Sequence, residues 1–77
     1  MKVTYDPAVD VLYISIRDDG SAAVDNIDLE PGISADLDAE GRVLGIEILD
    51  ASARTGNESP IGVSFELLGT EPVSSAS

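Results

Sequence analysis

Apolar and polar residues alternate along much of this chain, which is the repeat of a β-strand. One segment, residues 11–16, is apolar on both faces and is typical of a central strand that is covered on each side. The pattern predicts a mainly β fold, an antiparallel β-meander of five to six strands with at most one short helix. The predicted strands are residues 2–5, 11–16, 22–29, 33–37, 43–48 and 61–68.

Glycine and proline mark the connections between these strands. Pro7 presets the backbone for a turn after the first strand, and Pro31-Gly32 fits the two central positions of a type II turn. Residues 17–20 end in glycine and predict a hairpin between the second and third strands. The apolar parity changes within the third strand, so we expect a β-bulge near residues 25–26.

The register of the hairpin between the fourth and fifth predicted strands follows from parity. A four-residue loop over residues 38–41, with Gly41 in the left-handed conformation, sets Ala35 opposite Leu44. A shift of one residue would set acidic residues opposite apolar ones on a common face, which is unfavourable. We therefore expect the four-residue loop.

The chain of 77 residues has room for one domain. We predict a single β-rich domain over residues 1–69, followed by a serine-rich, disordered tail over residues 70–77. Residues 50–54 favour one helical turn that is capped by Asp50.

The last predicted strand, residues 61–68, is detached from the other strands, with Val63, Phe65 and Leu67 expected to face inward. A small domain with an apolar sheet face also needs cover for that face. We therefore predict a homodimer in which the last strand can cross to the second subunit.

The charge balance is strongly acidic, with 15 Asp and Glu residues against 4 Lys and Arg residues and a formal net charge of -11. Because no basic cluster is present to bind phosphates or anionic lipid, we expect no nucleic acid partner and no membrane partner. The absence of Cys excludes a disulfide framework and a thiolate metal site, and we expect no cofactor. No stretch is apolar enough to span a bilayer, so the expected location is cytoplasmic.

Three stretches form a recognisable pattern: YDP at residues 5–7, DVLYI at residues 10–14 and GRVLGIEILDAS at residues 41–52. Together with the acidic strand between them, they resemble the small prokaryotic family called domain of unknown function 2283, over about residues 1–54. The resemblance implies a stand-alone β-rich domain without an assigned reaction. It also implies, from some members, an antitoxin-like role as the partner of small toxin-like proteins. It carries over no catalytic residue.

Residues 36–47 match the spacing of an EF-hand calcium loop, with oxygen ligands at Asp36, Asp38, Glu40 and Glu47. An EF-hand needs flanking helices, whereas both flanks here alternate with period two. In the expected hairpin register, Glu47 also lies several residues from the turn. A calcium-binding domain is therefore an alternative to a plain β-hairpin with a solvated acidic face.

The leading interpretation is a non-enzymatic protein-binding domain, antitoxin-like toward a basic partner. Like charges on one face repel one another in the free protein, and a basic protein would relieve that repulsion. A purely structural domain with no dedicated ligand is a further alternative. The candidate partner-binding residues are the outward acidic positions Asp25, Asp28, Glu30, Asp36, Asp38 and Glu47.

Catalysis is not expected from this composition. The sequence has no His to act as a base, and its serines are interpreted as outward strand residues, cap residues or tail residues. Tyr5 and Tyr13 lie on neighbouring predicted strands, where we expect them to pack against each other across the sheet.

Overall fold

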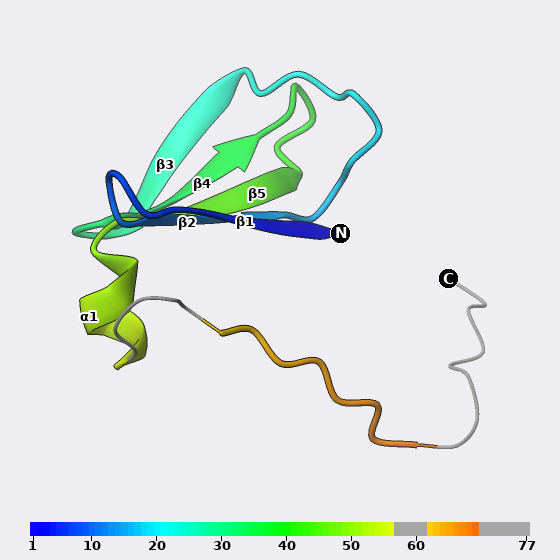
Figure 1. Ribbon diagram of the computed structural model, residues 1–77. Coiled ribbons are helices and arrows are strands. Elements are labelled where there is room, and N and C mark those ends of the chain that lie inside the picture. Colours follow the sequence, from blue (N-terminus) through cyan, green and yellow to red (C-terminus); the bar gives the residue numbers. More distant parts are fainter. Residues whose placement is uncertain (57–61, 70–77) are drawn as a thin grey trace.

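A computed structural model describes residues 1–56 and 62–69 of the chain and shows one antiparallel sheet with one short helix (Figure 1). The prediction of a mainly β fold is confirmed. The strands pair in the order β1-β2-β5-β4-β3. The elements are β1 (Lys2–Asp6), β2 (Val11–Ser15), β3 (Asp25–Glu30), β4 (Ile33–Leu37), β5 (Val43–Ile48) and α1 (Ala51–Thr55).

The sheet consists of a hairpin, β1–β2, joined to a three-stranded meander, β3–β4–β5, through pairing of β2 with β5. The predicted hairpin over residues 17–20 is therefore wrong, because β2 does not pair with β3. The apolar content of β2 explains the choice of neighbour. Ile14 lies opposite Ile46 of β5, whereas β3 would have offered acidic side chains.

The turn between β4 and β5 is longer than predicted, and the register differs. Ala35 lies opposite Ile46 rather than Leu44, and Leu44 is the extra residue of a bulge. Asp38 sets this geometry, because its main-chain N–H donates to the carbonyl of Arg42 at 2.9 Å and closes a five-residue turn over residues 38–42. Gly41 has the expected left-handed conformation, with a φ of 79°.

The predicted bulge in β3 is present at a different place. The register shifts between Asp28 and Glu30, close to the turn at Pro31, and not near residues 25–26. Gly32 has a φ of 87°, as a type II turn requires at its second central position. The bulge leaves the parity of residues 25–28 unbroken, so that stretch presents two distinct sides.

The registers give the sheet an apolar face and a polar face. The two predicted tyrosine partners lie on different faces, because Tyr5 is opposite Leu12 whereas Tyr13 is opposite Thr4, so their expected packing is wrong. The apolar face carries Val3, Tyr5, Leu12, Ile14, Ile27, Ile33, Ala35, Ile46 and Ile48. On the four strands other than β1, the polar face carries Tyr13, Asn26, Asp28, Ser34, Asp36, Gly45 and Glu47.

The helix α1 forms where predicted, but Asp50 does not cap it. Asp50 is in the left-handed conformation and makes no side-chain cap hydrogen bond. Asp10, in the turn between β1 and β2, caps the helix instead: its carboxylate accepts from the Ser52 main-chain N–H at 3.0 Å and from the Ser52 hydroxyl at 2.6 Å. The Tyr5 hydroxyl donates to the same carboxylate at 2.7 Å. These hydrogen bonds hold the pKa of Asp10 below its usual value, the Ser52 hydroxyl contributing most.

Arg54 ties the other side of α1 to the turn between β3 and β4. Its guanidinium donates to Glu30 at 2.8 Å, to the Leu49 carbonyl at 3.1 Å and to the Pro31 carbonyl. The short helix therefore joins the hairpin to the meander at one end of the sheet. Ala51, at its first position, is completely buried.

The detached segment does not form the predicted last strand. Residues 62–69 have no regular secondary structure, and the three side chains expected to face inward, Val63, Phe65 and Leu67, are exposed by 64%, 86% and 74%. Residue 61 and the predicted tail over residues 70–77 lie outside the described residues. Within the described part of the chain, no helix has the length and hydropathy needed to cross a bilayer.

Candidate functional site

The centre of the polar face is a hydrogen-bonded chain of side chains from β2, β4 and β3. The Tyr13 hydroxyl donates to one carboxylate oxygen of Asp36 at 2.9 Å. The side-chain amide of Asn26 donates to the other oxygen at 2.8 Å and to the Ser34 hydroxyl at 3.3 Å. The carboxylate of Asp36 is thus held from both sides, in a fixed orientation on the sheet.

Gly45 of β5 lets this chain of contacts form. Gly45 lies between β2 and β4, opposite Asp36, and the Tyr13 ring crosses the space that a side chain there would fill. A Cβ built on Gly45 would stand 2.8 Å from the Tyr13 Cε2 atom and closer still to its hydroxyl oxygen. Only glycine lets the ring lie across β5 and reach Asp36.

In the part of the chain that the structure describes, the acidic groups on this face form no ion pair. Asp28, Asp36 and Glu47 share the face, and in the described residues none of them lies within salt-bridge distance of a basic group. Lys2 is on the same side, on the edge strand β1. The cluster therefore carries negative charge that the protein itself leaves uncompensated.

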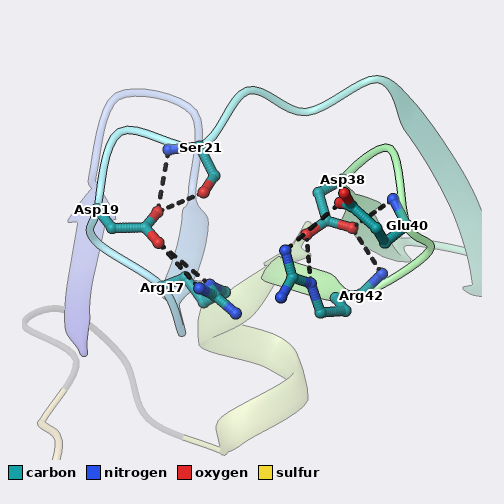
Figure 2. A network of polar contacts seen from close by, with 6 residues as sticks. All are labelled: Arg17, Asp19, Ser21, Asp38, Glu40 and Arg42. Carbon is teal, nitrogen blue, oxygen red and sulfur yellow. Dashed lines mark hydrogen bonds and ion pairs between the residues drawn. The ribbon is translucent and has the colours of Figure 1, made fainter.

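All three arginines pair with acids elsewhere. Arg17 contacts Asp19 at 3.0 Å, Arg42 contacts Asp38 at 2.8 Å and Arg54 contacts Glu30 at 2.8 Å. The first two pairs lie in neighbouring loops at one end of the sheet (Figure 2). The arginines thus neutralise the turns and leave the polar face acidic.

Asp38 organises the turn between β4 and β5. Its carboxylate accepts from the main-chain N–H of Arg42 at 2.8 Å, from the N–H of Glu40 at 2.9 Å and from the Arg42 guanidinium (Figure 2). The main-chain hydrogen bond from Arg42 contributes most to holding the pKa of Asp38 below its usual value. In the adjacent loop, the hydroxyl of Ser21 does the same for the pKa of Asp19.

The four residues of the candidate calcium loop fall in two places. Asp38 and Glu40 lie in the turn, where both contact Arg42, whereas Asp36 and Glu47 lie on the polar face. Among residues 1–56 and 62–69, no group of three or more His, Cys, Asp or Glu side chains could hold a metal ion. Cation binding by these four residues would require Asp38 and Glu40 to leave Arg42.

The six candidate partner-binding acids also separate. Asp28, Asp36 and Glu47 come together on the polar face. Asp38 lies in the turn described above. Asp25 lies opposite Leu37 and Glu30 opposite Ile33, which places both on the apolar side of the sheet.

Sequence reasoning missed the residues that orient the carboxylate, Tyr13, Asn26 and Gly45. One signal was available, because a glycine inside an otherwise apolar strand often marks a close approach by another group. It also missed Asp10 as the cap of α1 and assigned that role to Asp50. No local pattern indicates that Asp10 reaches Ser52, since 42 residues separate them.

The ionisation of Tyr13 reports on this site. The pKa of Tyr13 is raised above its usual value of 10.0. Partial burial makes the largest contribution, and the hydrogen bond to Asp36 makes the next largest. We expect Asp36→Asn to lower that pKa without restoring the ordinary value, because burial remains. The measurement is a titration of phenolate absorbance in a Tyr5→Phe background, which leaves Tyr13 as the only tyrosine.

The matched control for this titration is Asp18→Asn, which removes one exposed carboxylate from the loop after β2. An equal fall in the Tyr13 pKa in both variants would contradict the Tyr13–Asp36 contact. Because the folded-state pKa of Tyr13 exceeds its unfolded value, the associated stabilisation is complete below pH 10. It is lost as the pH rises through the folded-state pKa.

Comparison with known proteins gives one family match. The model of a family described as "Protein of unknown function (DUF2283)" matches residues 2–52. This range includes all five strands and the start of α1. No curated protein matches the chain, and no solved structure matches it.

Proposed function

The chain belongs to the DUF2283 family of proteins of unknown function, and from that premise we propose that it is a non-enzymatic protein-binding domain. Its polar face would receive a basic segment of a protein partner, as an antitoxin-like protein receives a small basic toxin. The observation that carries the proposal is the uncompensated acidic cluster of Asp28, Asp36 and Glu47 on the polar face, where Asp36 accepts a hydrogen bond from Tyr13.

The cluster has the chemistry that recognises arginine or lysine. A carboxylate offers about four lone-pair positions, and Asp36 uses two of them for Tyr13 and Asn26, so acceptor positions remain for a cation. A neighbouring tyrosine ring adds a surface on which a guanidinium can stack. Because the Asp36 side chain is already held in one orientation, it would lose little conformational freedom when a partner binds.

The same arrangement favours binding over catalysis. The sequence has no His and no Cys. Among the described residues two Ser–Asp pairs are in close contact: Ser52 with Asp10 in the helix cap, and Ser21 with Asp19 in the loop after β2. The hydroxyl proton of Ser52 is donated into that cap. We therefore propose no reaction for this domain.

The test is affinity capture from the source cells at low and moderate salt, read by mass spectrometry. We expect one basic protein at stoichiometric level, released as the salt concentration rises, because screening weakens charge pairs at an exposed interface. In the double variant Asp28→Asn/Glu47→Gln, affinity for that protein should fall by about tenfold or more.

A charge-matched variant separates the face from the net charge. Asp18→Asn/Asp50→Asn removes the same number of carboxylates from exposed positions outside the polar face. It should retain the partner nearly as well as the unmodified chain. Equal losses in the two variants, or the absence of any basic protein at either salt concentration, would contradict the proposal.

A further inference from the structure

The apolar face of the sheet lacks adequate cover in the single chain. On the two edge strands, Val3 is 39% exposed and Ile27 is 42% exposed, and no large side chain of residues 1–56 and 62–69 is fully buried. The buried apolar residues of that part of the chain are Leu12, Ala35, Leu44 and Ala51. Leu12 and Ala35 on the inner strands of the apolar face are thus covered, whereas its two edges leave large apolar side chains exposed, and in so small a domain such exposure marks an interface.

The exposed C-terminal segment has the composition of a strand that lacks a sheet. In residues 62–69, Val63, Phe65 and Leu67 alternate with Ser64 and Glu66, so an extended conformation would have one apolar side. The same three apolar side chains are exposed. The chain therefore carries both an apolar face with exposed edges and an apolar segment that could extend such a face.

We propose that a second copy of this chain packs on the apolar face and that its residues 62–69 pair with the edge strand β1 of the first copy, reciprocally. The area that a stable interface must bury indicates that both the apolar face and residues 62–69 contribute to it. Five strands about 4.8 Å apart and about 17 Å long give a face of about 400 Å². Each partner in a standard stable interface buries about 800 Å², so the C-terminal segments would supply much of the remainder.

Charge favours β1 over β3 as the edge that receives the segment. The segment carries Glu66. Strand β1 carries one base, Lys2, and one acid, Asp6, whereas β3 carries three acids and would repel the segment. Charge also favours a second copy across the apolar face. Of the two acids on that side of the sheet, Glu30 is neutralised by Arg54, and Asp25 is exposed on β3, the edge strand farthest from β1. Both acidic polar faces would point outward, where water screens their repulsion.

The first test is the mass of the full chain in solution, by light scattering during size-exclusion chromatography. We expect twice the chain mass of 8.0 kDa. Val3→Asp places a charge in the proposed interface and should shift the protein to monomer. The matched variant Thr4→Asp, on the next residue and the opposite face of β1, should stay dimeric. An unmodified chain that is monomeric at NMR concentrations would overturn the proposal.

The second test follows the exchanged segment. The chain has no Cys, so Ser64→Cys supplies a single attachment point for a spin label. Spin-labelled chain at natural isotope abundance is mixed with unmodified ¹⁵N chain and left to exchange subunits. We expect broadening of the ¹⁵N amide signals of residues 2–6. A dimer in which those signals stay sharp would overturn the exchange. Broadening that appears only when the spin label and ¹⁵N are in the same chain would also overturn it, because the segment would then pair within its own subunit.

Discussion

Replacement of Asp10 by glycine will lower the melting temperature by about 10 °C. The carboxylate accepts from Tyr5 and twice from Ser52, so its removal leaves the first turn of α1 without its side-chain cap. Of the hydrogen bonds that Asp10 makes to the helix, only that from the Ala51 N–H to the Asp10 carbonyl would remain. Glycine suits the left-handed backbone of Asp10, which has a φ of 57°, so the loss will reflect the missing carboxylate and not backbone strain. Thermal unfolding followed by circular dichroism measures it.

Asp50→Gly is the matched control for that experiment. Asp50 is also left-handed, with a φ of 51°, and is the residue that local sequence would choose as the cap, but its side chain makes no cap hydrogen bond. Its replacement should leave the melting temperature unchanged or raise it slightly, because glycine relieves the left-handed conformation. If Asp50→Gly destabilises the protein as much as Asp10→Gly, the capping role of Asp10 is wrong.

Gly45→Ala is the second substitution with a large expected effect, on both stability and binding. The new methyl group would occupy the space of the Tyr13 ring, which must swing off β5 and release Asp36. Overpacking of this kind corresponds to a fall in melting temperature of about 5–15 °C. Capture of a basic partner should weaken in parallel, because Asp36 loses its fixed orientation.

A double-mutant cycle shows whether Tyr13 is the cause. Gly45 has no positive φ, so alanine fits its backbone, and in a Tyr13→Ala background Gly45→Ala should be neutral or slightly stabilising. The coupling between the two positions is then the measured quantity. Equal destabilisation by Gly45→Ala in both backgrounds would show that the glycine is needed for some other reason.

The sheet could be predicted from the sequence because its information is local. The period-two alternation and the turn residues Pro7, Gly32 and Gly41 placed most of the strands and turns. Strand order depends instead on which distant apolar strand meets β2. Local turn chemistry at residues 17–20 suggested a neighbour in sequence, but the apolar match of β2 with β5 determined the pairing.

The candidate site was predictable only in part for the same reason. The six predicted outward acids include Asp28, Asp36 and Glu47, and the structure brings these three together on one face. The pairing of Asp38 with Arg42 depends on the conformation of one turn. The Tyr13–Asp36 contact depends on two strands that are separated by a third. Neither relation leaves a repeat or a spacing that sequence analysis could detect.

The strand order has a consequence for how the molecule folds. The hairpin β1–β2 and the meander β3–β4–β5 can each form from contacts between sequence neighbours, but a two-stranded hairpin alone is at best marginally stable. The hairpin and the meander can pair only after a long loop closes, which costs conformational entropy. That cost precedes the stabilisation from β2–β5 pairing and from the Asp10–Ser52 contact. During synthesis, the N-terminal hairpin therefore waits for nearly all of the domain to leave the ribosome before it acquires a stable partner.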